Sequence, residues 1–205
     1  RACPDLGKNR FIRSQQQGKL PETWDDSLHN IACFTSSSDE FAAIGKEWKN
    51  PLFEDQEQGL KWILEQTRSR ASDIHFYVRM HPNLTGVSNE STRQLRELVG
   101  PHFTIIDPES PISSYTLAQA ADTVLTFGSS LGIESVYWGT PSVLVGSCFY
   151  QNLEATYNPR SVDELPDLLS RKLEPKDREP ALRYGYYFST FGKRFRYYQA
   201  VSSKQ

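Results

Sequence analysis

Residues 121–146 constrain the fold of this chain more than any other part of its sequence. An apolar run of β-favouring residues, 123–127, ends at Gly128, and a short helical pattern follows. That pattern stops at Gly139, a residue type suited to the left-handed backbone at a helix C-terminus. A second apolar run, 142–145, comes directly afterwards. We therefore predict a strand, a short helix and a second strand.

Ser129 and Ser130 stand where this helix begins, so we expect their two hydroxyls to cap it. In a βαβ unit the start of the helix lies at the carboxyl edge of a parallel sheet. Open α/β sheets bind ligands at that edge, and unpaired N–H groups there attract phosphate. The stretch therefore predicts an anion site.

The rest of the chain repeats this alternation of strands and helices. Apolar runs predict further strands at residues 30–35, 73–80 and 103–106, and helical patterns occur at residues 55–69, 91–99, 115–121 and 161–171. The order predicts one α/β domain with a Rossmann-like, doubly wound parallel sheet.

Composition narrows the function classes. The 205 residues hold 23 basic and 25 acidic side chains, so we expect no nucleic-acid partner. No apolar run approaches the roughly 20 residues of a membrane helix, and no signal peptide is visible. Cys3, Cys33 and Cys148 lie far apart without metal-ligand spacing, which favours buried free thiols and a cytoplasmic protein.

Two other strand ends carry polar side chains. Ser36, Ser37 and Ser38 follow the first strand, where they form either an anion-binding loop or a helix cap. Arg79 and His81 end another strand, because a residue before proline is held extended. Arginine binds phosphate with two parallel hydrogen bonds, and histidine can donate a hydrogen bond or move a proton.

These groups together predict a nucleotide site at one edge of the sheet. Ser129 and Ser130 would bind phosphate, and Glu134, about one turn into the helix, would bind ribose hydroxyls. Ser110, in the loop after the strand at residues 103–106, reaches the same edge and completes the candidate set.

Several other site types are disfavoured. The chain has no GxGxxG and no GxxxxGK[ST] motif, and no His/Cys cluster that indicates a metal. The run GSSLG at residues 128–132 loosely matches the GxSxG of serine hydrolases. Those enzymes place their histidine after the nucleophile, and no histidine follows His102.

The ordered motifs FTSSSDE (34–40), RMHP (79–82), GSSLGIE (128–134) and GTP (139–141) resemble bacterial capsule-polysaccharide biosynthesis glycosyltransferases, which include the Kdo transferases. The resemblance covers roughly residues 30–150. It implies the nucleotide-binding C-terminal half of a GT-B glycosyltransferase.

The resemblance also assigns roles to particular residues. His81, and Ser129 with Ser130, would contact the phosphate of a CMP-activated sugar. His81 could stabilise the leaving phosphate, with no metal or other cofactor needed. The catalytic base is unknown, because the acidic catalytic residue of these enzymes usually belongs to the N-terminal half.

The implied donor is CMP-Kdo or a related CMP-sugar, with a UDP- or GDP-sugar as the alternative. The acceptor would be a glycan or a glycolipid. The chain begins with Arg1 and its one methionine is Met80, so we expect an N-terminal half to precede it.

We expect three segments along the chain. Residues 1–29 would be a lead-in or interdomain linker, and residues 30–177 the nucleotide-sugar-binding domain. Residues 178–205 would be an aromatic, basic helical segment that packs on this domain or on the N-terminal half. A rival interpretation is a non-catalytic α/β module that uses this segment to dock a partner, or to contact the inner membrane peripherally.

Overall fold

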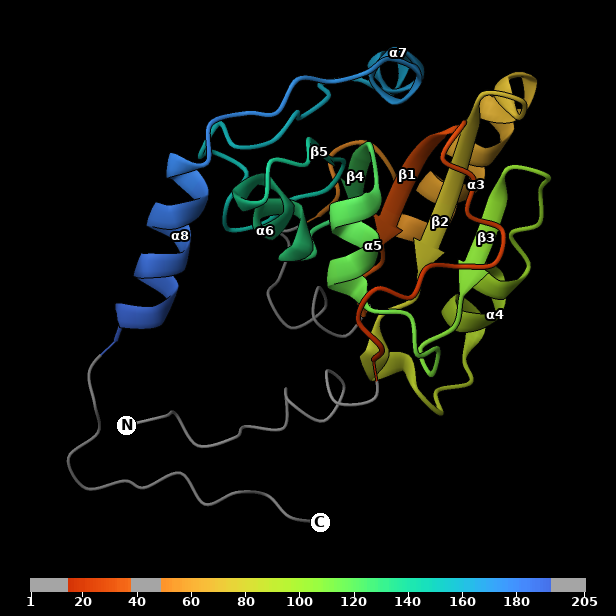
Figure 1. Ribbon diagram of the computed structural model, residues 1–205, viewed down its shortest axis with the longest axis horizontal. Coiled ribbons are helices and arrows are strands. Elements are labelled where there is room, and N and C mark those ends of the chain that lie inside the picture. The colour runs from red at the N-terminus through yellow and green to blue at the C-terminus, as the bar shows by residue number, and fades with distance from the viewer. Residues whose placement is uncertain (1–14, 38–48, 193–205) are drawn as a thin grey trace.

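The computed structural model describes residues 15–37 and 49–192. Its centre is a sheet of five strands in the order β3-β2-β1-β4-β5, and every strand pair is parallel (Figure 1). The strands are β1 (His29–Phe34), β2 (Ile74–Arg79), β3 (Phe103–Ile106), β4 (Thr123–Thr126) and β5 (Ser142–Leu144). The prediction of a Rossmann-like, doubly wound parallel sheet is confirmed.

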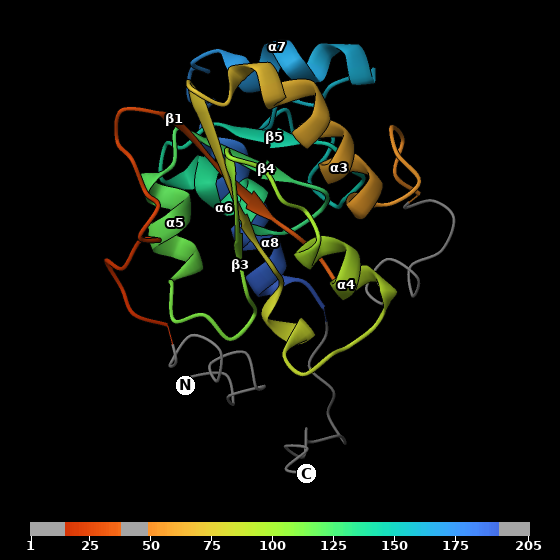
Figure 2. The ribbon, with the colours of Figure 1, turned by 90° about the vertical axis from the view of Figure 1, so that its right-hand side faces the viewer.

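Helices cover both faces of the sheet, as parallel strands joined by crossovers require. One face packs against α3 (Gln56–Thr67), α4 (Glu90–Arg96) and α7 (Leu165–Ser170). The other carries α5 (Ser114–Ala120), α6 (Leu131–Tyr137) and α8 (Glu179–Thr190). Figure 2 shows α5 and α3 on opposite sides of the strands.

Local signals in the sequence explain most element boundaries. The carboxylate of Asp55 caps α3 by accepting from the backbone N–H of Gln58 at 2.8 Å, and Ser113 caps α5 in the same way. The helix predicted over residues 161–171 instead begins with a 3₁₀ turn (Val162–Glu164), and α7 follows, with Pro166 in its first turn.

All six residues of β2 are buried, including the polar His75 and Arg79, so both faces of this strand are covered. The segment before β1 covers the second face. Trp24 stacks on Tyr77 with ring centroids 4.7 Å apart, and the Tyr77 hydroxyl donates to the Thr23 carbonyl. This segment, predicted as a lead-in or linker, thus packs against the core through Leu20 and Trp24.

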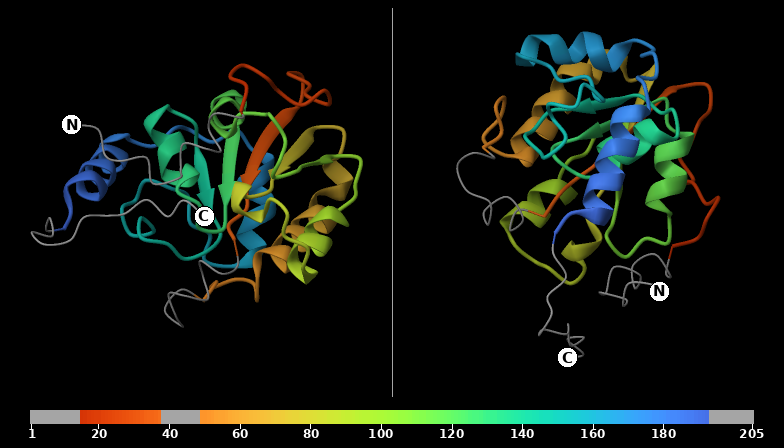
Figure 3. Two further views of the ribbon diagram at one scale, coloured as in Figure 1. Left: turned by 90° about the horizontal axis from the view of Figure 1, so that it is seen from below. Right: turned by 90° about the vertical axis from the view of Figure 1, so that its left-hand side faces the viewer.

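Helix α8 packs against α6 through Ala181 and Tyr184 (Figure 3, right). The helix runs through Gly185 without a break. Its outer face is aromatic and exposed: Tyr186 is 73% and Phe191 71% accessible to solvent. The basic residues that follow position 192 in the predicted C-terminal segment lie outside the described part of the chain.

Two of the three cysteines are described, and both are buried free thiols as predicted. Cys33 lies near the carboxyl end of β1 and is fully buried, which raises the pKa of its thiol. Burial also raises the pKa of Cys148 to about 11. Both sulfurs therefore remain protonated at neutral pH.

Candidate functional site

The predicted site lies where β1, β2 and β4 end at the carboxyl edge of the sheet. Strands β1 and β4 are neighbours, but the chain leaves β1 toward α3 on one face and β4 toward α6 on the other. Open α/β sheets bind their ligands in the crevice formed where connections diverge in this way. A small cavity of 160 Å³, here called the edge cavity, opens at this point.

Five of the predicted residues line the edge cavity. Arg79 and His81 come from the end of β2, Ser129 and Ser130 from the turn after β4, and Glu134 from α6. The other residues of the lining are Gln15, Phe34, Thr35, Met80, Pro82, Ser114, Tyr115 and Leu131.

Hydrogen bonds hold both the backbone and the ring of His81. Its backbone N–H donates to Oγ1 of Thr35 at 3.0 Å, and its Nδ1 accepts from the backbone N–H of Asn83 at 3.1 Å. Because Nδ1 is an acceptor, the neutral imidazole carries its proton on Nε2. A phosphate oxygen could accept a hydrogen bond from that group.

The turn after β4 presents the two serines. Gly128 adopts a φ of 147°, a backbone conformation that favours glycine. The Ser129 hydroxyl accepts from the backbone N–H of Leu131 at 3.4 Å. Ser130 begins α6 without a side-chain capping bond, so the prediction that both hydroxyls cap this helix is wrong for Ser130. Its side chain is exposed at the cavity instead.

The carboxylate of Glu134 lies beside the phenol of Tyr115. Burial raises the pKa of Tyr115, and the negative charge of Glu134 raises it further. Tyr115 therefore keeps its hydroxyl proton at neutral pH, next to a carboxylate that can accept from hydroxyl groups. This pair offers both a donor and acceptors to a polyhydroxylated ligand.

Arg79 is buried, and its guanidinium is directed into the loop after β3. It donates to the backbone carbonyls of Asp107 and Ser110, the latter at 3.1 Å, and also approaches that of Pro108. Burial lowers the pKa of Arg79 to about 10, and the carboxylates of Asp107 and Glu109 oppose this shift. The side chain remains charged at neutral pH and holds the loop, a role that its position in the sequence does not indicate.

The remaining predicted residues lie beside the edge cavity or beyond the described region. Ser110 contributes its carbonyl to Arg79 and does not line the cavity. Gln56 clamps the backbone of Ser36, accepting from its N–H at 3.0 Å and donating to its carbonyl at 2.8 Å. Ser37 is buried and also does not line the cavity. Ser38 lies outside the described residues.

Eight residues that line the edge cavity were not predicted as site residues, among them Thr35, Tyr115 and Gln15. Thr35 directly precedes the serine run, so its place at a strand end was a usable signal. Tyr115 follows the serines that begin α5 and could have been found in the same way. Gln15 could not, because its side chain reaches the backbone N–H of Ser114 from far along the chain.

A larger cavity of 900 Å³, here called the α8 groove, lies between α5, α6 and α8. It shares Tyr115, Ser130 and Glu134 with the edge cavity, so the two are continuous. Aromatic residues from both walls line it, among them Tyr137, Trp138 and Phe188.

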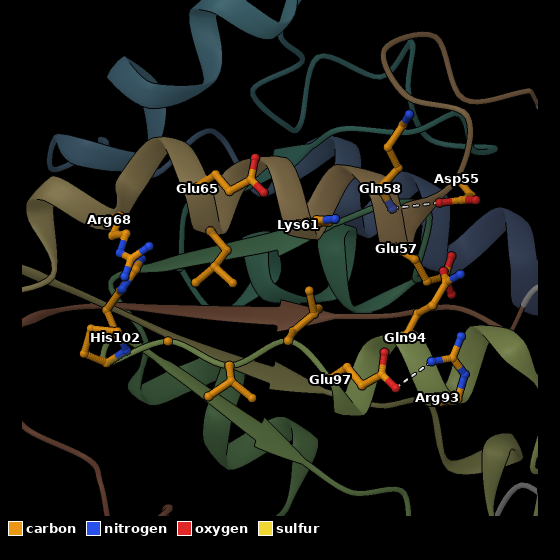
Figure 4. Close-up of a pocket in the computed structure, with 15 residues that line it drawn as sticks. Asp55, Glu57, Gln58, Lys61, Glu65, Arg68, Arg93, Gln94, Glu97 and His102 are labelled. Atoms are coloured by element: carbon orange, nitrogen blue, oxygen red, sulfur yellow. Dashed lines mark hydrogen bonds and ion pairs between the residues drawn. The ribbon is translucent and has the colours of Figure 1, made fainter.

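Another groove, of 710 Å³, separates α3 from α4 and is lined by none of the predicted residues (Figure 4). Two of its charged side chains pair with each other: the guanidinium of Arg93 donates to the carboxylate of Glu97 at 2.6 Å. The groove lies on the helical surface, away from the carboxyl ends of the strands, and this exposed ion pair indicates a solvated surface.

Within residues 15–37 and 49–192, no group of three or more His, Cys, Asp or Glu side chains could hold a metal ion. No helix in the same regions is long and apolar enough to cross a membrane.

Comparisons with known proteins show that the fold of this chain is similar to that of several solved structures. No family model and no curated protein matches the chain. Among solved structures, KpsC from Thermosulfurimonas dismutans, a beta Kdo 2,4 transferase, matches 88% of this chain with a TM-score of 0.52 and 12% identity. A putative UDP-N-acetylglucosamine 2-epimerase from Listeria monocytogenes matches 88% of it with a TM-score of 0.50 and 14% identity.

This chain spans about half the length of both structures, 55% and 50% of the respective chains. The expected architecture, a Rossmann-like sheet as in one half of a GT-B enzyme, is thus confirmed as a fold. At these identities the match carries no residue roles and no substrate.

Proposed function

We propose that this chain is the donor-binding half of a GT-B glycosyltransferase that builds a bacterial surface polysaccharide. One observation carries the proposal: the edge cavity gathers His81, Ser129, Ser130 and Glu134 at the crevice where the strand connections diverge. The motifs at residues 34–40, 79–82 and 128–134, which resemble those of the Kdo transferases, support CMP-activated Kdo, or a related CMP-sugar, as the donor. A UDP- or GDP-sugar is the second candidate.

The chemistry of the edge cavity suits the phosphate and ribose of such a donor. The Nε2 proton of His81 and the hydroxyls of Ser129 and Ser130 would donate to phosphate oxygens. The carboxylate of Glu134 would accept from ribose hydroxyls. A volume of 160 Å³ is below the roughly 300 Å³ at which drug-sized sites begin. The base and sugar would therefore extend beyond this cavity.

In the transfer step the glycosidic bond to phosphate breaks and negative charge develops on the leaving nucleotide. A hydrogen-bond donor that is fixed in place before the reaction stabilises that charge, because it does not have to reorganise. The bonds from Thr35 and Asn83 fix His81 in this way. We assign the catalytic base and the site for a glycan or glycolipid acceptor to an N-terminal half, and expect the enzyme in the cytoplasm.

Titration calorimetry with CMP, UDP and GDP tests the proposal. We expect at least one nucleotide to bind, and the tightest to identify the donor base. Ser130→Ala should weaken binding about tenfold, because a hydrogen bond to a charged group contributes roughly 1.5–3 kcal/mol. Ser161→Ala is the matched control, since Ser161 also begins a helical turn without a side-chain capping bond.

The proposal fails if the folded protein binds none of the three nucleotides. It also fails if Ser130→Ala and Glu134→Gln leave the affinity unchanged. The rival function, a non-catalytic module that docks a partner, is favoured by the exposed aromatic face of α8. Under the rival, Tyr186→Ser would abolish partner or vesicle association and nucleotide would have no effect.

A further inference from the structure

Tyr150 lies in the loop after β5 with its side chain almost fully buried, at 1% exposure. Its hydroxyl reaches the turn that carries the two serines. It donates to the carbonyl oxygen of Ser129 at 2.6 Å, and it lies 3.3 Å from Oγ1 of Thr126, at the end of β4. No motif in the sequence marks this residue.

The single proton of the Tyr150 hydroxyl is committed to Ser129. The Thr126 hydroxyl must therefore be the donor in the other bond. Burial raises the pKa of Tyr150 well above its ordinary value. The hydroxyl thus remains a donor across the neutral range, and the Ser129 carbonyl is held at any pH at which an enzyme of this type would work.

Gly132 makes this contact sterically feasible. A Cβ at position 132 would lie 2.3 Å from the Tyr150 hydroxyl oxygen and 2.8 Å from Oγ1 of Thr126, both too close for any side chain. The second glycine of the GSSLG run is therefore explained by the approach of Tyr150. Helix α6 passes directly over the hydroxyl because it has no side chain at this position.

Close packing of its own loop and a ring contact with α8 hold Tyr150 in place. A Cβ at Gly146 would lie 2.0 Å from the carbonyl oxygen of Phe127, so the loop after β5 lies tightly against the end of β4. The ring of Tyr150 meets that of Tyr184 on α8 edge-on, with centroids 5.9 Å apart. Because its surroundings hold it in place, the Tyr150 hydroxyl can fix the Ser129 carbonyl to which it is hydrogen-bonded.

We propose that Tyr150 is a positioning residue of the edge cavity, whose hydroxyl fixes the Ser129 carbonyl and thereby orients the Ser129–Ser130 turn toward the phosphate. This role rests on the proposed function. It is exerted through the turn, because Tyr150 does not line the edge cavity.

Tyr150→Phe tests the proposal, because it removes one oxygen and keeps the ring. The matched control is Tyr157→Phe, which removes a tyrosine hydroxyl that donates to another backbone carbonyl, that of Glu174, at 2.9 Å. Each variant should lower the melting temperature by about 2–4 °C. Only Tyr150→Phe should weaken CMP or UDP binding, roughly tenfold, as loss of a supporting contact does.

Amide hydrogen exchange gives a readout that requires no ligand. Loss of the Tyr150 hydroxyl should speed exchange in residues 129–132, and Tyr157→Phe should not. If Tyr150→Phe does not fold, Gly132→Ala displaces the same hydroxyl and the same comparison applies. Equal affinities and equal exchange in this turn for both tyrosine variants would overturn the proposal.

The two proposals can be separated by experiment. If wild-type protein binds no nucleotide, the proposed function fails, and exchange in residues 129–132 alone decides whether Tyr150 fixes the turn. If wild-type protein binds nucleotide and Ser130→Ala weakens binding but Tyr150→Phe does not, the function stands and the positioning role is rejected.

Discussion

The backbone N–H of His81 donates to the hydroxyl of Thr35 at 3.0 Å, and the same hydroxyl donates to the carbonyl of Arg79 at 3.4 Å. The side chain of Thr35, on the loop after β1, therefore holds the backbone of both Arg79 and His81 in place. Thr35 is 1% exposed, so water does not replace these bonds.

We expect Thr35→Val to loosen His81 and to leave its N–H without a partner. Nucleotide affinity should fall about 3- to 10-fold and the free energy of unfolding by roughly 1–3 kcal/mol. Calorimetry and urea denaturation measure the two effects. Thr35→Ser keeps the hydroxyl and should bind nucleotide like the wild type; equal losses in both variants would contradict this role of the hydroxyl.

Arg79 stabilises the loop after β3 through its bonds to backbone carbonyls. Arg79→Met keeps the length of the side chain and removes the donors. We expect a loss of roughly 3 kcal/mol in the free energy of unfolding, since buried carbonyls lose charged partners. The control is Arg93→Met at an exposed ion pair, which should leave the free energy of unfolding nearly unchanged. Comparable losses in urea denaturation would contradict this role.

Two glycines should respond to alanine in opposite directions. At Gly132 a methyl group would collide with the Tyr150 hydroxyl, and we expect a destabilisation of about 1–3 kcal/mol. At Gly185, inside α8, a Cβ would meet nothing within 4 Å. There we expect stabilisation of roughly 0.5–1 kcal/mol from better helix propensity. Thermal melts of both variants measure the two effects, and melting temperatures that shift in the same direction would contradict the structure.

The buried histidines should make the protein acid-sensitive. Thr67 donates its hydroxyl proton to the Ile63 carbonyl, so His102 donates from Nε2 to the Thr67 oxygen, and its buried Nδ1 has no partner among the described residues. Protonation would place a charge in this buried site.

Burial lowers the pKa of His102 below its ordinary value of 6.5, as it does for His29 and His75. The unfolded chain therefore binds more protons than the folded one as the pH falls below 6.5, and stability is lost in that direction. Melting temperatures should be flat above pH 7 and fall toward pH 5. His102→Gln should flatten the decline, and an unchanged slope would exclude His102 as a cause.

The sequence predicted those parts of the fold that local signals determine. Strand β3 (Phe103–Ile106) has the predicted bounds, and α3 (Gln56–Thr67) begins one residue after the predicted start of the helix at residue 55. The carboxyl edge was predictable for the same reason, because parallel strands deliver their ends to one side. His81, Ser129, Ser130 and Glu134 accordingly line one cavity.

Contacts made only in the folded chain could not be predicted in this way. Arg79 has the chemistry of a phosphate ligand, but carbonyls of residues 107–110 take up its donors. Ser36 has the chemistry of an anion loop, but the amide of Gln56 holds its backbone. In both cases a distant segment supplies the partner, and no short-range pattern encodes it.

Because Cys33 is fully buried, its reaction with a thiol reagent can report when the centre of the sheet opens. Its thiol lies on the middle strand, between the two strands whose ends carry His81 and the serine turn. A thiol reagent cannot reach it while the helices on that face of the sheet stay in place, because Cys33 lies in the core with Leu60 and Ile63 of α3. The rate of alkylation at Cys33 therefore measures how often this face of the sheet becomes exposed, without any label having to be introduced.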